Sequence, residues 1–376
     1  QLGISSSMTK QIPFFNYPSI FKEHGDEYAN LMTDICSRGA YIMQQELLDF
    51  EKALAEYLGV KYAFGVGDGT MALIMGVRAA GLEPGSEIIV PSHTFVASAA
   101  AIHHAGCVPV LADCGPDHLV DGSDIAKRIT KKTSAIMPVQ LNGRVANMDP
   151  IEELCRIHDL KIIEDSCQAL GAKFRGKFAG TFGAAGAFSF YPSKTLGCFG
   201  DGGAVVTNSD EVAEQIELMR DHGRNANGSV SLFGYNSRLD NVQAGVLLLK
   251  LREYGVQVEK RRSLAARYQK GLGDLSAVFL PPAPDAENEH FDIFQNYEIE
   301  ADRRDDLRTY LADQGIGTIL QWGGRVIHQF EELGLNQDVP RTEAMTHKFM
   351  LLPMNTSVSF EDVDYICEQI HNFYNK

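Results

Sequence analysis

One lysine, Lys194, stands in a run of apolar, aromatic and hydroxyl residues that extends from Phe188 to Gly197. No carboxylate lies within five positions of it, so no local ion pair would hold its ammonium form. Burial among such neighbours lowers the pKa of a lysine, and a neutral amine can attack a carbonyl carbon. The alternative is a lysine on a surface turn whose ammonium group reaches water.

A carboxylate upstream could act together with this amine. Residues 161–163 predict a short apolar strand, and Asp165 comes at its carboxyl end, where open α/β sheets place ligand sites. Pyridoxal phosphate needs a lysine for a Schiff base and an acid beside its pyridinium nitrogen. Asp165 and Lys194, at successive strand ends, would meet both needs. The alternative for Asp165 is a helix cap after the strand.

A glycine-rich turn supplies a candidate phosphate site. Residues 65–70, Gly-Val-Gly-Asp-Gly-Thr, follow a predicted strand and precede a predicted helix. The dinucleotide fingerprint needs glycine at the position of Thr70, so a nicotinamide-dependent oxidoreductase is the weaker alternative. The amides of Gly69 and Thr70, with the Thr70 hydroxyl, would hold one phosphate at a helix N-terminus. A plain turn in which Thr70 only caps the helix stays open.

The elements that must position these residues alternate along the chain. Apolar spacing predicts helices over 28–38, 44–58, 70–80, 97–104, 150–158 and 211–221, and strands over 62–66, 88–90, 108–111, 135–139, 161–163, 184–190 and 203–207. Such alternation predicts an α/β fold with a mostly parallel sheet covered by helices on both faces. A long helix from residue 242, a proline-rich break at 281–284 and further short elements predict a small α+β domain. We therefore expect a large domain over 1–250 and a small one over 251–376.

The composition excludes several classes of protein. The 376 residues carry a formal net charge of −15, which disfavours binding to nucleic acid or to an anionic membrane. Seven scattered cysteines without a Cys-x-x-Cys pair indicate reduced thiols in a cytoplasmic protein and no metal site. Residues 1–7 lack the basic end and apolar run of a signal peptide, and no apolar run reaches the roughly 18 residues of a membrane span.

Four segments in order resemble the DegT/DnrJ/EryC1/StrS family of sugar aminotransferases. They are Glu-Asp-Ser-Cys-Gln-Ala at 164–169, Ser-Phe-Tyr-Pro-Ser-Lys at 189–194, Gly-Asp-Gly-Gly at 200–203 and Gly-Tyr-Asn-Ser-Arg-Leu at 234–239. The resemblance runs from about Ile12 to the C-terminus. It implies a fold-type I transferase that uses pyridoxal 5′-phosphate, with Lys194 and Asp165 as its catalytic residues.

The resemblance also implies roles for residues that would otherwise look ordinary. Ser189, Gly69 and Thr70 match the phosphate site, Phe95 the ring that stacks on the cofactor, and Gln168 a partner of its 3-hydroxyl. Without the family, they would be a strand serine, a strand-to-helix turn, a core phenylalanine and a helix-entry side chain. Asn236 and Arg238 match a segment that reaches the active site of the other subunit, which implies a homodimer with shared active sites.

Four further positions are candidates for contact with the substrate: Gln140, Arg224, Arg238 and Trp322. The arginines, with Arg220 and His222, could meet a carboxylate or phosphate, or form a solvated loop face. Many relatives have histidine at the position of Gln140, and many have a His-Tyr pair near the position of Gln321-Trp322. These two differences suggest a sugar unlike the commonest nucleotide-linked 4-ketohexose. Trp322 could stack on this sugar or fill the core.

These observations predict an aminotransferase. Glutamate would donate the amino group, Lys194 would carry the proton between Cα and the cofactor, and a keto sugar would accept the group. This reaction would belong to aminosugar or bacterial surface-polysaccharide (lipopolysaccharide) synthesis, with 8-amino-3,8-dideoxy-octulosonate as a specific expectation. One alternative is a nucleotide-linked 3- or 4-keto hexose, and another is a non-catalytic regulatory protein of the same fold. The family's dehydratases have histidine in place of the lysine, so Lys194 argues against that activity.

Overall fold

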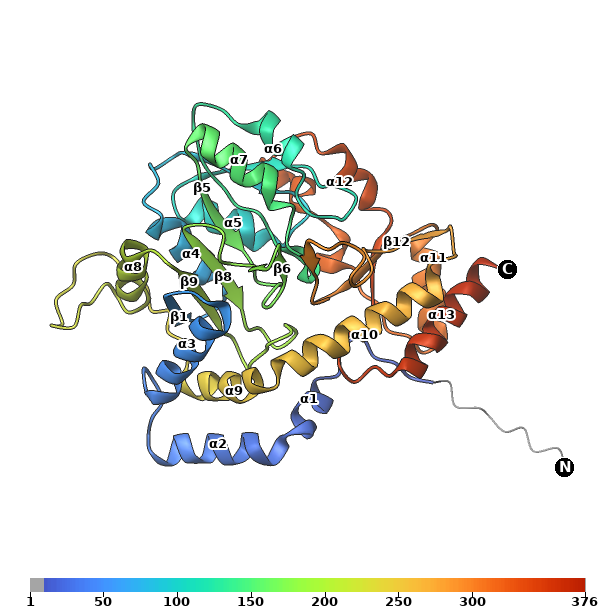
Figure 1. The fold of residues 1–376 in the computed structure, drawn as a ribbon, viewed down its shortest axis with the longest axis horizontal. Coiled ribbons are helices and arrows are strands. Elements are labelled where there is room, and N and C mark those ends of the chain that lie inside the picture. The colour runs from blue at the N-terminus through green and yellow to red at the C-terminus, as the bar shows by residue number, and fades with distance from the viewer. Residues whose placement is uncertain (1–9, 376) are drawn as a thin grey trace.

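A seven-stranded sheet lies at the centre of the larger part of the molecule in the computed structural model, which describes residues 10–375 (Figure 1). Its strand order is β1-β9-β8-β5-β4-β2-β3. The strands are β1 (Tyr62–Val66), β2 (Glu87–Pro91), β3 (Val108–Ala112), β4 (Thr133–Ile136), β5 (Lys161–Asp165), β8 (Ala185–Ser189) and β9 (Gly203–Thr207). β9 runs antiparallel to both of its neighbours, and the other six strands run in one direction. The predicted α/β fold with a mostly parallel sheet is confirmed.

Six helices that precede, connect or follow these strands bury their apolar faces against the sheet. They are α3 (Gln45–Leu58), α4 (Gly69–Ala79), α5 (Val96–His104), α6 (Gly122–Arg128), α7 (Met148–His158) and α8 (Asp210–Arg220), and α1 (Tyr17–Glu23) and α2 (Gly25–Ser37) precede them. In α3, Leu47, Phe50, Leu54 and Leu58 recur at helical spacing and are buried. Gly59 ends this helix with a φ of 67°, a conformation that glycine adopts without steric cost.

The region predicted as one long helix is two helices, α9 (Asn241–Arg252) and α10 (Tyr254–Leu272), which meet at Glu253. Figure 1 shows α10 extending from α9 to the C-terminal elements. Its first turns pack in the main core through Tyr254 and Val258, and its last turns pack in a second hydrophobic cluster through Tyr268 and Leu272. The domain boundary at 250/251 stays a prediction.

The second cluster is built from α10, a three-stranded antiparallel sheet and two helices. These elements are β10 (Val278–Phe279), β12 (Tyr297–Ala301), β13 (Phe349–Leu352), α11 (Arg304–Asp313) and α13 (Phe360–Tyr374). The other elements are β6 (Lys173–Phe174), β7 (Lys177–Phe178), β11 (His290–Phe291), α12 (Pro340–Met345) and the 3₁₀ turns η1 (Leu141–Gly143), η2 (Gln321–Gly324), η3 (Ile327–Gln329) and η4 (Glu331–Leu333). Within residues 10–375, no helix has both the length and the apolar character needed to span a membrane.

Candidate active site

A cavity of about 490 Å³ opens at the carboxyl edge of the central sheet. Most of the predicted site residues line it: Gly69, Thr70, Phe95, Asp165, Gln168, Ser189, Lys194 and Trp322. Their elements explain the convergence, because β1, β5 and β8 run parallel and each is followed directly by site residues. Gln295, Gln321 and Leu351 close the cavity from the C-terminal part of the chain.

The turn after β1 directs the N-terminus of α4 into this cavity. Asp68, not Thr70, caps the helix, since its carboxylate accepts the Met71 amide at 2.7 Å. The Thr70 hydroxyl and the first amides of the helix are therefore left for a ligand. A Cβ atom on Gly69 would lie 2.8 Å from Cβ of Ser189, so only glycine lets the turn pack closely against the end of β8.

Asp165 is buried where β5 ends. Its Oδ2 accepts the hydroxyl of Ser98 at 2.6 Å, and its Oδ1 accepts the amide of Cys167 at 3.2 Å. The carboxylate is therefore fixed from α5 as well as from its own loop. Sequence reasoning missed Ser98, and no local pattern identifies it because its partner lies 67 positions away.

Lys194 is half-buried, and its Nζ has no hydrogen-bond partner in the part of the chain that the structure describes. Burial lowers its pKa, and the charge of Asp165 only partly opposes this effect. Gln295 holds the backbone on both sides of the lysine: its Oε1 accepts the Thr195 amide at 2.7 Å, and its Nε2 donates to the Ser193 carbonyl at 2.9 Å. The site thus presents a fixed lysine whose amine is more readily neutral than usual.

Aromatic rings line the mouth of the cavity. Phe95 is 52% exposed, which excludes the alternative of a core phenylalanine and leaves its ring free to stack on a ligand. Trp322 lies with its ring 5.1 Å from that of His93 while still lining the cavity. Phe14, Phe15 and Tyr191 also line it and were not predicted. Their only signal in the sequence was their aromatic character.

Gln140 does not reach the cavity. It is fully buried beneath it, where its Nε2 donates to Glu164 at 2.9 Å and its Oε1 accepts the Ala146 amide at 2.8 Å. Burial raises the pKa of Glu164 to about 7, although Gln140 and two backbone amides lower it. The expected contact of Gln140 with the sugar therefore needs correction: this side chain supports the core of the site.

The segment between α8 and α9 also lies outside the cavity of its own chain. Arg224 and Arg238 each pair with Asp221 at 2.8 Å, and Asn236 is exposed. The expected basic cluster is thus largely neutralised within the chain. Phe233, in the same segment, is 93% exposed. Contact of Asn236, Arg224 and Arg238 with a ligand stays a prediction. Such a ligand would have to be bound in the cavity of another subunit.

The residues present fit pyridoxal phosphate. A helix N-terminus with a free hydroxyl suits its phosphate, the fixed carboxylate of Asp165 suits its ring nitrogen, and the exposed face of Phe95 suits its ring. Lys194 lines the same cavity and would attach to its aldehyde carbon.

Comparison with known proteins agrees with this chemistry. A family model described as the DegT/DnrJ/EryC1/StrS aminotransferase family matches residues 22–371. The dTDP-3-amino-3,4,6-trideoxy-alpha-D-glucose transaminase of Streptomyces venezuelae is 37% identical over 355 residues, 93% of this chain and 93% of that protein. The pleiotropic regulatory protein of Geobacillus stearothermophilus is 34% identical over 371 residues, 96% of this chain and 98% of its own.

A solved structure agrees over the whole fold. The crystal structure of DesV from S. venezuelae, in complex with a ketimine intermediate, superimposes with a TM-score of 0.93 at 34% identity. The match covers 98% of this chain and 100% of that one.

Proposed function

The chain belongs to the DegT/DnrJ/EryC1/StrS aminotransferase family, and we propose that it moves an amino group from glutamate to the 3-keto group of a nucleotide-linked hexose. The predicted family, its transaminase activity on sugars and its pyridoxal phosphate cofactor are confirmed. The octulosonate product has no support, because several relatives are named for nucleotide-linked hexoses. In these three names the amino group is at C3 of the relative's own sugar, which supports the nucleotide-linked alternative for this chain.

The observation that carries the proposal is the meeting of Lys194, Asp165 and the α4 N-terminus in one cavity. When bound, pyridoxal phosphate supplies an electron sink for the carbanion formed at Cα of the amino donor. Asp165 favours the cationic form of the ring nitrogen by its negative charge. Lys194 Nζ takes the proton from Cα of the donor and later delivers one to the sugar carbon that gains nitrogen.

The lining of the cavity suits a sugar acceptor. Phe14, Phe15, Tyr191 and Trp322 present aromatic surface beside the proposed cofactor site, and such surface packs well against the C–H faces of a sugar ring. Since donor and acceptor use the same cavity in turn, we expect ping-pong kinetics.

The proposal includes a homodimer with shared active sites. It is supported by the position of Asn236 and Arg238 outside their own cavity and by the nearly complete exposure of Phe233 beside them. That the product enters lipopolysaccharide, and that the enzyme acts in the cytoplasm, stay predictions.

The decisive experiment incubates the holoenzyme with glutamate and follows the cofactor absorbance while nucleotide-linked 3-keto and 4-keto hexoses are added. We expect glutamate to convert the cofactor to its amino form and a 3-keto hexose to return it. If glutamate converts the cofactor but only a 4-keto hexose or a free keto sugar returns it, the proposed substrate is wrong and the proposed aminotransferase activity stands. Cofactor that binds but reacts with no amino donor would instead favour the regulatory alternative. A Lys194→Ala variant should lose the absorbance of the lysine-linked cofactor.

A further inference from the structure

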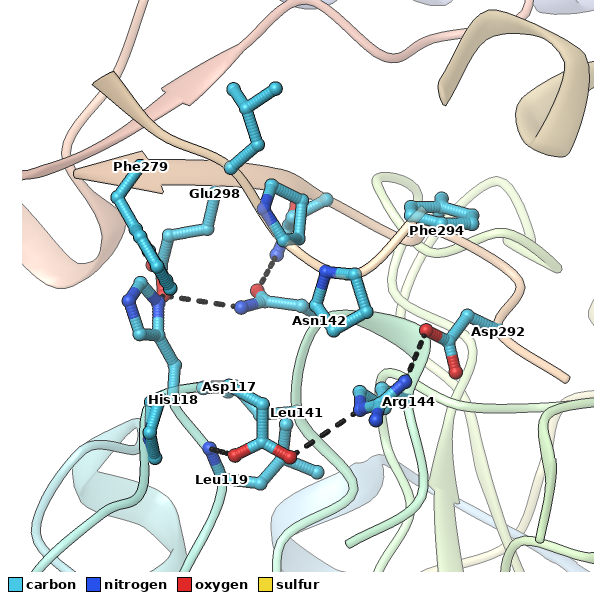
Figure 2. A pocket seen from close by; sticks show the side chains of 15 residues that line it. Asp117, His118, Leu119, Leu141, Asn142, Arg144, Phe279, Asp292, Phe294 and Glu298 are labelled. Carbon is cyan, nitrogen blue, oxygen red and sulfur yellow. Dashed lines mark hydrogen bonds and ion pairs between the residues drawn. The ribbon is translucent and has the colours of Figure 1, made fainter. Parts of the chain in front are cut away.

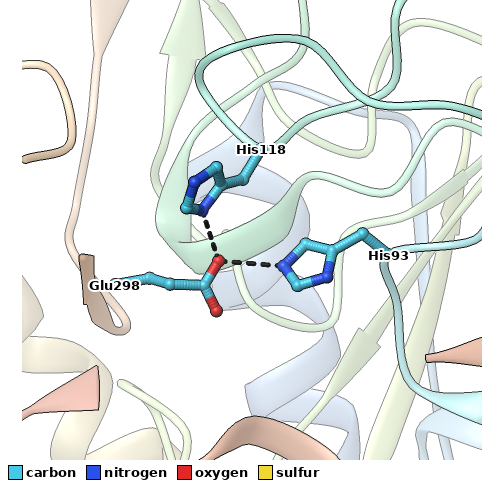
Figure 3. A group of neighbouring side chains, drawn as sticks. All are labelled: His93, His118 and Glu298. Atoms are coloured by element: carbon cyan, nitrogen blue, oxygen red, sulfur yellow. Dashed lines mark hydrogen bonds and ion pairs between the residues drawn. The ribbon is translucent and has the colours of Figure 1, made fainter. Parts of the chain in front are cut away.

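Two buried histidines donate to one carboxylate beside the active site. Nδ1 of His118 lies 2.6 Å, and Nε2 of His93 2.9 Å, from the same oxygen of Glu298 on β12 (Figure 3). His118 also contacts Glu300 through Nε2 at 2.9 Å. Burial lowers the pKa of His118, but the two carboxylates outweigh it and raise this pKa to about 9. The histidines in turn hold the pKa of Glu298 well below its usual value against the effect of burial. Glu298 is therefore an ionised carboxylate that can only accept hydrogen bonds.

These residue types would also suit a divalent metal ion. The distances argue against one, because separations of 2.6 and 2.9 Å are those of hydrogen bonds. An ion about 2 Å from each ligand would need the nitrogen and oxygen atoms farther apart.

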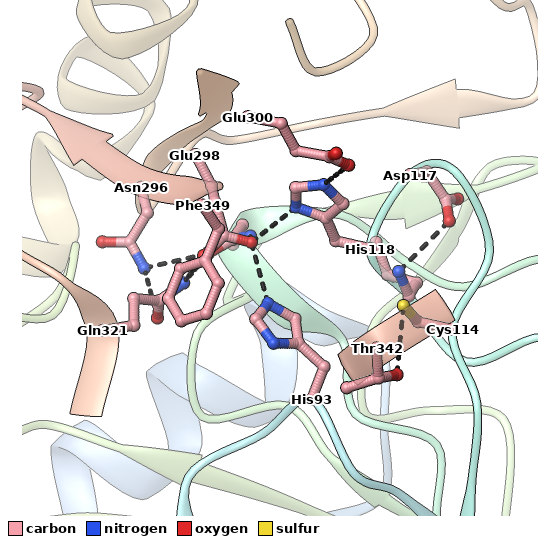
Figure 4. A network of polar contacts seen from close by, with 12 residues as sticks. His93, Cys114, Asp117, His118, Asn296, Glu298, Glu300, Gln321, Thr342 and Phe349 are labelled. Carbon is pink, nitrogen blue, oxygen red and sulfur yellow. Dashed lines mark hydrogen bonds and ion pairs between the residues drawn. The ribbon is translucent and has the colours of Figure 1, made fainter. Parts of the chain in front are cut away.

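The fixed polarity of Glu298 sets the orientation of Gln321. Its Nε2 donates to Oε2 of Glu298 at 2.5 Å (Figure 4). The same Nε2 donates to Oδ1 of Asn142 at 2.8 Å. Asn142 points toward Glu298 from η1 and donates to its other oxygen at 3.2 Å (Figure 2). Both N–H groups of Gln321 are thus used, and its Oε1 must face Asn296 and Gln168.

Gln168 is the last amide in this series and lines the cavity. Its Oε1 accepts the backbone amide of Asn142 at 2.8 Å, and its Nε2 donates to Oε1 of Gln321 at 3.3 Å. The Asn142 amide holds the Oε1 end of Gln168, and Oε1 of Gln321 holds its Nε2 end, so the orientation of Gln168 depends on both contacts. One N–H of its amide group then has no partner among residues 10–375.

We propose that Glu298 is a positioning residue, which, through Gln321, keeps Gln168 oriented to donate a hydrogen bond to the 3-oxygen of bound pyridoxal phosphate. The inference rests on the proposed role of Gln168 at that oxygen. A donor stabilises negative charge on the ring oxygen. The oxygen then attracts the proton on the lysine-linked nitrogen less strongly, so this proton is lost at a lower pH.

The test is the pH midpoint of the absorbance change of the lysine-linked cofactor, measured in holoenzyme without substrate. Gln168→Leu should raise this midpoint by about one pH unit, the size expected for losing one hydrogen bond to a charged oxygen. Glu298→Gln should raise it by about half as much, since an amide at this position no longer dictates the polarity of Gln321. In the Gln168→Leu background, Glu298→Gln should add nothing.

Glu300→Gln is the matched control. It removes a carboxylate from the same histidine and the same strand but leaves the contacts of Gln321 intact, so its midpoint should equal that of the wild type. If Glu298→Gln does not fold, Gln321→Met breaks the same connection and leaves Glu298 charged and paired with its two histidines.

The outcomes separate the role of Gln168 at the 3-oxygen from the positioning role of Glu298. An unchanged midpoint in Gln168→Leu overturns the role of Gln168 itself. A shift in Gln168→Leu with none in Glu298→Gln or Gln321→Met overturns the positioning role, as does an equal shift in Glu300→Gln.

Discussion

The Ser98 hydroxyl donates to Oδ2 of Asp165 at 2.6 Å, so the carboxylate that faces the cofactor site is held by a helix from a different βα unit. This hydrogen bond fixes the direction of the Asp165 carboxylate. Charge and orientation at this position can therefore be tested separately.

Replacing Asp165 by Asn removes the charge and keeps the shape. We expect kcat/KM to fall by about 10²-fold or more, because the ring nitrogen loses its charged partner. Ser98→Ala should cost about tenfold, the value of one hydrogen bond to a charged group. Ser166→Ala is the matched control, since the buried Ser166 hydroxyl has no partner in the described residues. Steady-state kinetics measure these losses of kcat/KM, which should decrease from Asp165→Asn to Ser98→Ala to Ser166→Ala. Equal losses in Ser98→Ala and Ser166→Ala would contradict the role of Ser98.

Lys194 should react with the cofactor as a neutral amine at lower pH than free lysine does. Burial lowers its pKa below 10.5, and the charge of Asp165 acts in the opposite direction. The rate at which apo-protein takes up pyridoxal phosphate should therefore rise with pH and level off below 10.5. In Asp165→Asn it should level off at a still lower pH. Stopped-flow absorbance measures both curves, and a wild-type midpoint at or above 10.5 would contradict the geometry.

Mixed dimers test the proposed shared active site. Lys194→Ala and Asn236→Ala should each be nearly inactive alone. Co-expression should restore about a quarter of the wild-type activity, because half of the dimers are mixed and each has one intact site. Mixed dimers purified through two different tags should have about half of the wild-type activity, because one of their two sites is intact. Full activity of Asn236→Ala alone, or no recovery in mixed dimers, would count against sharing.

Gln140 should matter for stability rather than for substrate binding. Gln140→Leu removes a donor from the buried Glu164 and leaves the Ala146 amide unpaired, which should lower the free energy of unfolding by about 2 kcal/mol. KM for the sugar should stay within about twofold. Trp322→Leu, in the cavity wall, should show the reverse pattern. Denaturant unfolding and steady-state kinetics on both variants separate a role in stability from a role in substrate binding. A raised KM for the sugar in Gln140→Leu would show that Gln140 contributes to substrate binding.

The sequence was sufficient where the determinants are local. Short apolar strands followed by Gly69, Asp165 and Lys194 placed these residues at one sheet edge, because strand ends in an α/β fold converge. The Glu298–Gln321–Gln168 series could not be predicted, since its contacts join residues 23 and 153 positions apart with no periodic pattern. Gln140 was expected at the sugar because the resemblance to the family places the substrate near this position, whereas packing buries its side chain.

The two carboxylates on His118 make a final prediction about pH. Because its pKa is raised to about 9, His118 contributes stability that is fully present below about pH 6.5 and is lost as pH rises through about 9. The free energy of unfolding should fall by up to about 3 kcal/mol across this window. His118→Asn, which suits the φ of 71° at this position, should flatten the fall, whereas His104→Asn, at an exposed site on α5, should not. Urea unfolding at several pH values measures the slopes, and parallel curves for His118→Asn and wild type would show that the carboxylates do not hold a charged imidazole.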